Sequence, residues 1–242
     1  MIIDSHAHLN FKAFNKDLKE IVQKCLDNDV WVVNVGSQYE TSFKAVEIAE
    51  QYPQGMYASV GLHPLHSDED FSYEKYQELA SFSKVVAIGE TGLDYFRGPD
   101  KEKQKQVFLS QMKLAQELKK PVILHCRMAH NDLLEMLSGF DNRGVIHCFS
   151  GTWLEAQRYL DLGFFIGFTG IIFKLDLKET IMKAPLEKIL VETDSPYLSS
   201  HDERNEPLFV REVAKEIARI RKIDYQEVEE KTFINTKNLF QI

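Results

Sequence analysis

Short runs of β-branched and aromatic residues alternate along the chain with longer segments that carry apolar residues at helical spacing. Each short run is bounded by polar or turn-forming residues, which is typical of a buried strand. These runs predict eight strands, at residues 2–6, 30–35, 56–61, 85–90, 121–126, 144–149, 164–168 and 188–193.

The longer segments predict helices between the strands. Residues 15–27 place Leu18, Ile21 and Cys25 on one face of a helix, because they recur at intervals of three and four. The charged positions of residues 206–222 and 224–240 are typical of helix faces exposed to solvent. Further segments with helical spacing are 101–119, 206–222 and 224–240.

Regular alternation of strands and helices implies a parallel sheet. Eight such units in a chain of 242 residues predict an α/β fold, the (β/α)8 TIM barrel. A doubly wound sheet is the alternative, but no glycine-rich turn follows the first strand. We find no repeat, low-complexity tract or linker, so we expect residues 1–242 to form a single domain.

The composition narrows the class of protein. With 44% hydrophobic and 27% charged residues, the chain can bury a large core. No apolar run approaches the roughly 20 residues of a membrane span, and no signal peptide is recognisable at the N-terminus. Three cysteines suit a reducing compartment, so we expect a cytoplasmic protein.

The net charge of −8 argues against a protein that coats nucleic acid through a broad basic face. It does not argue against an enzyme that binds a few phosphates at a metal ion, because the ion supplies local positive charge. A nuclease is therefore compatible with the composition.

The segment "IIDSHAHL" (2–9) begins as a strand and continues with three polar side chains at alternate positions. Asp4, His6 and His8 are predicted to share one face, because strand side chains alternate with a period of two. A metal site and a solvent-facing strand end are both compatible with this segment alone.

Polar residues follow the same pattern at other strands. In a TIM barrel the carboxyl ends of all strands face one mouth, where active sites are built, so these side chains are predicted to converge. The residues at or just beyond predicted strand ends are His6, His8, His63, Glu90, His125, His147 and Asp194.

Imidazole and carboxylate groups together favour Zn²⁺ or another first-row divalent ion. The number of candidate ligands exceeds what one tetrahedral ion needs and suits two ions that share a bridging carboxylate. Cys126 and Cys148 each follow a candidate histidine, so alternation predicts that they point away from the barrel axis into the core. Because no serine or cysteine nucleophile stands out, the predicted nucleophile is a water molecule activated by metal.

Six segments together resemble the TatD family of metal-dependent hydrolases, and they span the whole chain. The resemblance implies an amidohydrolase-like barrel and a metal-dependent deoxyribonuclease, often a 3'-5' exonuclease on single strands. The segments are "IDSHAHL", "VGLHP", "IGETGLDY", "LHCRMAHNDL", "HCFSG" and "VETDSPYL…RNEP".

By position, the resemblance implies two metal ions, which are Zn²⁺, Mn²⁺, Mg²⁺ or Ni²⁺. The implied ligands of the first ion are His6, His8, Glu90 and Asp194, and those of the second are Glu90, His125 and His147.

Four residues are also assigned roles toward the substrate or the attacking water. Glu90 and Asp194 are the expected catalytic carboxylates, with Asp194 as proton acceptor for the water. His63 and Arg127 are expected to bind substrate phosphate, although Arg127 also fits the pattern of a salt-bridged arginine at the rim. Asp4 is expected to support the ligands or to pack beneath them.

The chain departs from the family pattern at two places near the mouth. Leu65 separates "LHP" from His66, where the family often has a second histidine directly. The segment "SSHDE" (199–203) replaces a longer, proline-rich and basic stretch. Both differences leave the substrate preference open.

Other functions remain to be weighed. Related barrels hydrolyse cyclic amides or esters with a carbamylated lysine as bridge, but Glu90 occupies that place and Lys174 lies well past its strand. A metallophosphatase would be expected to carry further HxH pairs, and a non-catalytic scaffold would not need the complete ligand set. The predicted substrate is DNA bound transiently by a monomer, with no membrane and no stable protein partner.

Overall fold

The computed structural model describes residues 1–199 and 203–242. Its eight strands are parallel and hydrogen-bonded in chain order, each to the next. They are β1 (Ile2–Ala7), β2 (Val30–Val35), β3 (Met56–Val60), β4 (Val85–Asp94), β5 (Val122–Arg127), β6 (Gly144–Ile146), β7 (Phe165–Phe168) and β8 (Ile189–Val191).

The two ends of the sheet meet beyond the last strand. The amide of Asp194 donates to the carbonyl of His6 over 2.9 Å, and the amide of His8 donates to the carbonyl of Ser195 over 2.8 Å. These bonds bring β8 against β1 and turn the sheet into a barrel. The predicted (β/α)8 fold class is confirmed.

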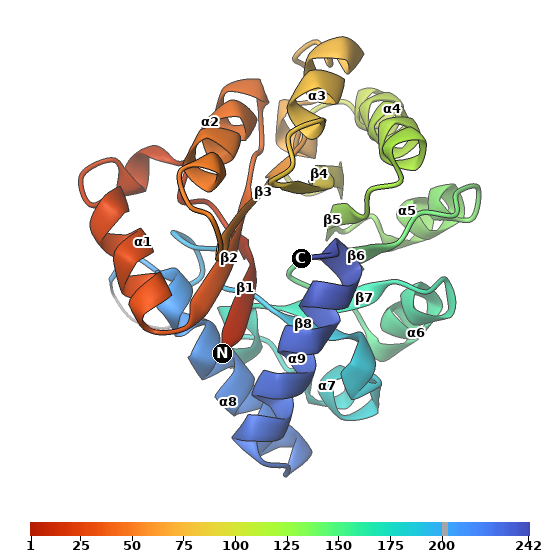
Figure 1. The fold of residues 1–242 in the computed structure, drawn as a ribbon. Helices are drawn as coiled ribbons and strands as arrows, with labels where there is room; N and C mark the ends of the chain where they lie inside the picture. Colours follow the sequence, from red (N-terminus) through yellow and green to blue (C-terminus); the bar gives the residue numbers. More distant parts are fainter. Residues whose placement is uncertain (200–202) are drawn as a thin grey trace.

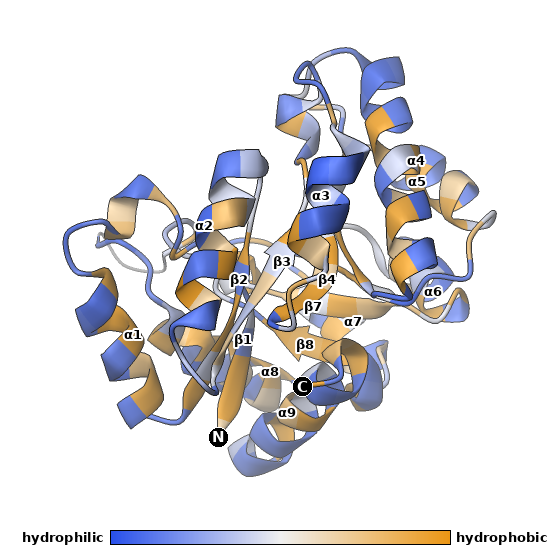
Figure 2. Cartoon of the chain, turned by 45° about the horizontal axis from the view of Figure 1, so that its top comes forward, coloured by the Kyte–Doolittle hydropathy of each residue, from blue (hydrophilic) through white to orange (hydrophobic). Residues whose placement is uncertain are grey.

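Helices surround the ring of strands (Figure 1). The hydropathy colouring is mostly orange on the strands, apart from part of β1 and the pale β3, and mixed on the helices, as expected for helices with one buried face (Figure 2). The α-helices are α1 (Leu18–Asp27), α2 (Tyr39–Glu50), α3 (Tyr73–Ala80), α4 (Lys101–Leu118), α5 (His130–Leu137), α6 (Trp153–Asp161), α7 (Lys178–Lys183), α8 (Val210–Arg221) and α9 (Tyr225–Phe240). Short 3-10 helices lie at η1 (Lys12–Phe14), η2 (Pro64–His66), η3 (Gly170–Phe173), η4 (Leu186–Lys188) and η5 (Pro207–Phe209).

Within the described part of the chain, no helix has both the length and the apolar character needed to cross a bilayer. Helix α9 instead runs across the barrel, and the C-terminus lies over the ring of strands (Figure 1). Leu239 and Phe240 pack against side chains inside the barrel, including Ile3, Val33 and Ile123. The end of the barrel at which the strands begin is therefore filled by apolar groups.

Strand β1 contains a bulge just before the predicted ligands. Asp4 pairs with Val32, whereas Ala7 pairs with Asn34, so three steps on β1 match two steps on β2. Such a bulge changes which face the following side chains occupy. Val32 packs between the strands and the helices, and Asp4, its partner in the register, faces the same way, whereas His6 lies beside Glu90 inside the mouth. The prediction that Asp4 shares a face with His6 and His8 is therefore wrong.

Strand β4 has a second bulge around Glu90. Ile88 pairs with Val122 and Thr91 pairs with Leu124, again three steps against two. Ile88 packs in the core between the strands and the helices, and Glu90, two residues later, lies inside the barrel mouth. The strand also continues to Asp94, so Glu90 lies within β4 and does not end it as predicted.

Candidate metal centre

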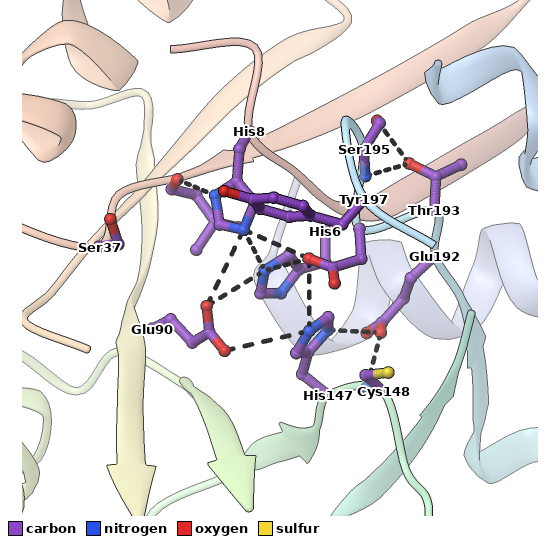
Figure 3. Close-up of polar contacts among 12 residues, drawn as sticks. His6, His8, Ser37, Glu90, His147, Cys148, Glu192, Thr193, Ser195 and Tyr197 are labelled. Carbon is purple, nitrogen blue, oxygen red and sulfur yellow. Dashed lines mark hydrogen bonds and ion pairs between the residues drawn. The ribbon is translucent and has the colours of Figure 1, made fainter. Parts of the chain in front are cut away.

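Glu90 is the central group of the barrel mouth, and only 3% of it is exposed. All five histidines predicted to converge lie within ion-pair distance of its carboxylate, and several of these contacts are drawn in Figure 3. The distances to the nearer carboxylate oxygen are 3.0 Å from His125, 3.4 Å from His63, 3.5 Å from His6 and 4.0 Å from both His8 and His147.

The two oxygens of Glu90 face different histidines. Oε2 faces His6 and His8, whereas Oε1 faces His63, His125 and His147. The ligand atoms of His6, His8 and Glu90 all lie within 4.8 Å of one another, and so do those of His63, Glu90 and His125. His63, predicted to bind substrate, is thus as close to Glu90 as the predicted ligands are.

Asp194, which follows β8, lies next to the group of His6, His8 and Glu90. Its Oδ1 lies 3.3 Å from His8 Nε2, 3.8 Å from His6 Nε2 and 3.7 Å from His147 Nε2. The imidazoles of His6 and His147 stack with their centroids 3.4 Å apart. The six predicted ligands therefore form one continuous cluster.

Asp4 joins the first and last strands on the outer side of the barrel wall, next to this cluster. Its Oδ1 accepts from the amides of His6 and Thr193, and its Oδ2 accepts from the Thr193 hydroxyl over 2.5 Å. Asn205 donates from the other side to the carbonyls of Thr193 and Tyr197, over 2.9 and 2.6 Å. Asp194 is therefore fixed by buried bonds on both sides.

The hydrogen bond of His8 shows how the cluster fits a cation. His8 Nδ1 donates to the carbonyl of Val35 over 2.7 Å, so in the neutral ring Nε2 carries a lone pair. His8 Nε2 lies 3.2 Å from His6 Nε2 and close to the carboxylates of Glu90 and Asp194. Converging acceptors of this kind, nitrogen and oxygen together, suit a first-row divalent ion.

Glu192 is a member of the cluster that the sequence interpretation missed. It is fully buried and accepts from His147 Nδ1 over 2.7 Å and from the Cys148 amide over 3.0 Å. A Cβ at Gly167 would lie 2.2 Å from its carboxylate, so only glycine leaves the space. The signal was present, because Glu192 precedes Asp194 by two residues in a segment of period two.

Asp94 is the second missed residue. Its Oδ2 lies 3.2 Å from His125 Nε2, while His125 Nδ1 faces Glu90. Its Oδ1 accepts from the amides of Phe96 and Arg97, which fixes the loop after β4. Carboxylates that hold a histidine in this way orient the ring and raise its basicity.

Burial and neighbouring charges together set the pKa values of the site. Burial would raise the pKa of Glu90, but His63, His6 and His125 hold it well below the usual range. Burial lowers the pKa of His6 to about 4, with His147 adding to the effect. Burial also opposes the charge on His147, yet Glu192, Asp194 and Glu90 outweigh it and raise the pKa of His147 to about 10.

We expect metal binding to release a proton from His147. The pKa of His147 is raised from 6.5 to about 10, so this imidazole is protonated in the metal-free protein at neutral pH. Its charge stabilises the fold fully below about pH 6.5, and this stabilisation is lost as the pH rises to about 10. A ligand histidine must be neutral, so binding of Zn²⁺ at about pH 7 should release about one proton from this residue. Titration calorimetry in buffers of different ionisation enthalpy measures the number, and no release would contradict the expectation.

The cluster opens into a cavity of about 1230 Å³. His63, Arg127, Leu65 and His66 all line it, so the departure from the family pattern at Leu65 does face the cavity. The guanidinium carbon of Arg127 lies 4.3 Å from the centroid of the Phe96 ring. Among the described residues Arg127 has no carboxylate partner, so the salt-bridged alternative receives no support.

The two cysteines differ. Cys126 is buried, with its Sγ 3.2 Å from His130 Nδ1. Cys148 is only half-buried and has a φ of 45°, although both cysteines line the cavity. The predicted core position of Cys148 is wrong because β6 ends at Ile146, so strand alternation does not extend to it.

Most of the second departure from the family pattern, "SSHDE", lies outside the described residues, which omit 200–202. Ser199 and Glu203 flank that gap. The loop nevertheless returns to the barrel through Arg204, which forms an ion pair with Asp17 next to α1.

A parallel eight-stranded barrel with a histidine and carboxylate cluster at its carboxyl mouth defines the class of the protein, that of the metal-dependent hydrolases. The family model "TatD related DNase" matches residues 3–241. The chain belongs to this family, and the resemblance found in the sequence is confirmed.

Relatives agree with this assignment over the full chain. The chain is 36% identical to "Uncharacterized metal-dependent hydrolase YabD" of Bacillus subtilis, with 100% of both chains covered. It is 33% identical to "3'-5' ssDNA/RNA exonuclease TatD" of Yersinia pseudotuberculosis, again with 100% of both covered. The crystal structure of YjjV, a TatD homologue of Escherichia coli, matches with a TM-score of 0.93 at 32% identity, covering 100% of this chain and 98% of that one.

Proposed function

We propose that this protein is a deoxyribonuclease that removes nucleotides from the 3' end of single-stranded DNA, with two divalent ions that share Glu90. One observation carries the proposal: the two oxygens of a single buried carboxylate face two different groups of histidines. The relative named as a 3'-5' ssDNA/RNA exonuclease supports the choice of substrate and direction.

The ligand sets follow from the contacts. His6, His8, Asp194 and Glu90 would hold one ion, and Glu90 with His125 and His147 would hold the other. Divalent ions bound there supply Lewis acidity, which lowers the pKa of a water and neutralises charge that develops on a phosphoryl group. Glu192 and Asp94 would orient His147 and His125 through their second ring nitrogens.

Asp194 is proposed to accept the proton of the attacking water. His8 and the other imidazoles hold the pKa of Asp194 below its usual range despite burial, so the carboxylate is ionised and able to accept. The water oxygen forms a bond to phosphorus, the bond from phosphorus to the leaving 3' oxygen breaks, and that oxygen takes up a proton from Asp194 or from bulk water. His63 lines the cavity beside Glu90, where it would contact a non-bridging phosphate oxygen.

A carbon-centred reaction of the cyclic amide type receives less support from the contacts. Glu90 occupies the bridging place in which related barrels use a carbamylated lysine. Lys174 is exposed at the end of η3 and is not among the described residues that line the cavity.

The test is a substrate panel of single-stranded DNA, duplex DNA, RNA, a small phosphodiester, a phosphomonoester and a cyclic amide. Each is assayed with Zn²⁺, Mn²⁺, Mg²⁺ or Ni²⁺ and with chelator. We expect shortening of single strands from the 3' end, lost to background with chelator. Turnover of the amide alone would overturn the proposal, and turnover of the monoester alone would indicate a phosphatase.

We further infer that the protein acts in the cytoplasm as a monomer and binds its DNA transiently. All three cysteines are free thiols in the structure, which suits a reducing compartment.

A further inference from the structure

Two large aromatic side chains stand exposed at the mouth of the barrel. Phe96 is 59% exposed and Tyr197 is 54% exposed, and both line the cavity above the metal centre. Single exposed apolar residues are common on protein surfaces. Two exposed rings that border the same polar cavity require a more specific explanation.

The two rings lie on opposite sides of the centre. Phe96 follows β4 and Tyr197 follows β8, and these strands are four positions apart in the ring of eight. Glu90 comes from β4 and Asp194 follows β8, so the carboxylates of the centre lie between the two aromatic side chains.

The backbone of both residues is anchored by hydrogen bonds. The amide of Phe96 donates to Asp94 Oδ1 over 2.9 Å. The amide of Tyr197 donates to the carbonyl of Asp194 over 2.8 Å, and its own carbonyl accepts from buried Asn205. The ring of Tyr197 lies beside His8, with the centroids 6.3 Å apart (Figure 3).

Phe96 also forms part of a composite surface. The Arg127 guanidinium lies over its ring, and the neighbouring Met128 is 71% exposed and lines the same cavity. An aromatic ring beside an arginine is a surface on which bases of single-stranded nucleic acids stack, because every base has a π-face.

We propose that Phe96 with Arg127 on one side, and Tyr197 on the other, bind the nucleobases on either side of the scissile phosphate. The inference rests on the proposed nuclease function and adds the residues that select the substrate. Stacking on these rings requires unpaired bases, since the bases of a duplex are already stacked and paired. Preference for single strands with little dependence on base sequence follows from this arrangement.

The test compares Phe96→Ala and Tyr197→Ala with the matched control Phe82→Ala. Phe82 is 43% exposed but is not among the described residues that line the cavity. We expect KM for a single-stranded oligonucleotide to rise about 5- to 150-fold in each cavity variant, the range for loss of one stacked base. Phe96→Tyr and Tyr197→Phe keep a ring and should restore KM.

Substrates with one abasic residue identify which nucleotide each aromatic ring binds. One abasic residue is placed at each position near the 3' end, and the effect of each alanine variant should shrink at one position that differs between the two variants. A 2-aminopurine base at that position should show stacking by fluorescence quenching that the alanine variant loses.

These experiments distinguish failure of the base-binding inference from failure of the proposed nuclease function. If the wild type degrades single strands but neither alanine variant changes KM or quenching, the base-binding inference is overturned and the nuclease function stands. An equal KM for duplex and single strands would also overturn the inference. If the wild type cleaves no phosphodiester in any metal, the nuclease function fails and the inference with it.

Discussion

Replacing Glu90 with glutamine is expected to remove both metal ions and to lower activity by at least about 1000-fold. The side chain is almost isosteric, so the effect would come from chemistry and not from volume. A carboxylate offers an acceptor on each oxygen, whereas an amide offers one oxygen and one NH₂ donor. One of the two histidine groups around Glu90 would then face a donor, and both groups would lose the shared negative charge that attracts a cation.

Metal analysis of the purified variant measures the first part, and the substrate panel measures the second. Glu179→Gln is the matched control, because Glu179 lines the same cavity but is 65% exposed and pairs with Lys183. Arg127→Ala should keep both ions and cost less activity than a substitution at Glu90. A Glu90→Gln variant that still bound two ions would show that Glu90 is not the bridge.

Replacing Glu192 with glutamine is expected to weaken metal binding or activity about 10- to 100-fold, the usual cost of losing a carboxylate behind a ligand histidine. Glu192 is fully buried and orients His147 through Nδ1 over 2.7 Å. Without its negative charge the pKa of His147 falls, so binding of metal should also release fewer protons than in the wild type.

Gly167→Ala provides an independent test, because the added Cβ would collide with the Glu192 carboxylate. We expect it to reproduce the loss of metal affinity without changing any charge. Glu187→Gln is the control, since Glu187 is 65% exposed and pairs only with Lys231 among the contacts of the described chain. Wild-type affinity in both Glu192→Gln and Gly167→Ala would exclude the supporting role.

The hydrophobic pattern was sufficient to predict the order and number of the strands, because each buried strand of a parallel barrel is a continuous apolar run. The ends of the strands were less predictable. β4 continues to Asp94 through Gly92, where a Cβ would lie 2.0 Å from the carbonyl of His125. Residues 91–94 stay extended because they pair with β5, and this pairing cannot be read from the sequence of β4 alone.

The candidate ligands could be predicted because polar residues at strand ends stand out against apolar runs. The face of the strand that each polar side chain occupies could not be predicted in every case. A strict period of two gave Asp4 the same face as His6, and the bulge in β1 reverses this. A bulge depends on how two strands pair, so the local pattern of polar and apolar residues does not show it.

The closure of the barrel between β1 and β8 has a consequence for folding. The bond between Thr193 and Asp4 joins residues 189 positions apart, and His6 and Asp194 meet only when this pairing is complete. Contacts of such large sequence separation slow folding because the intervening chain must be ordered first. A partly folded chain, with β1 and β8 still apart, therefore lacks the complete ligand set.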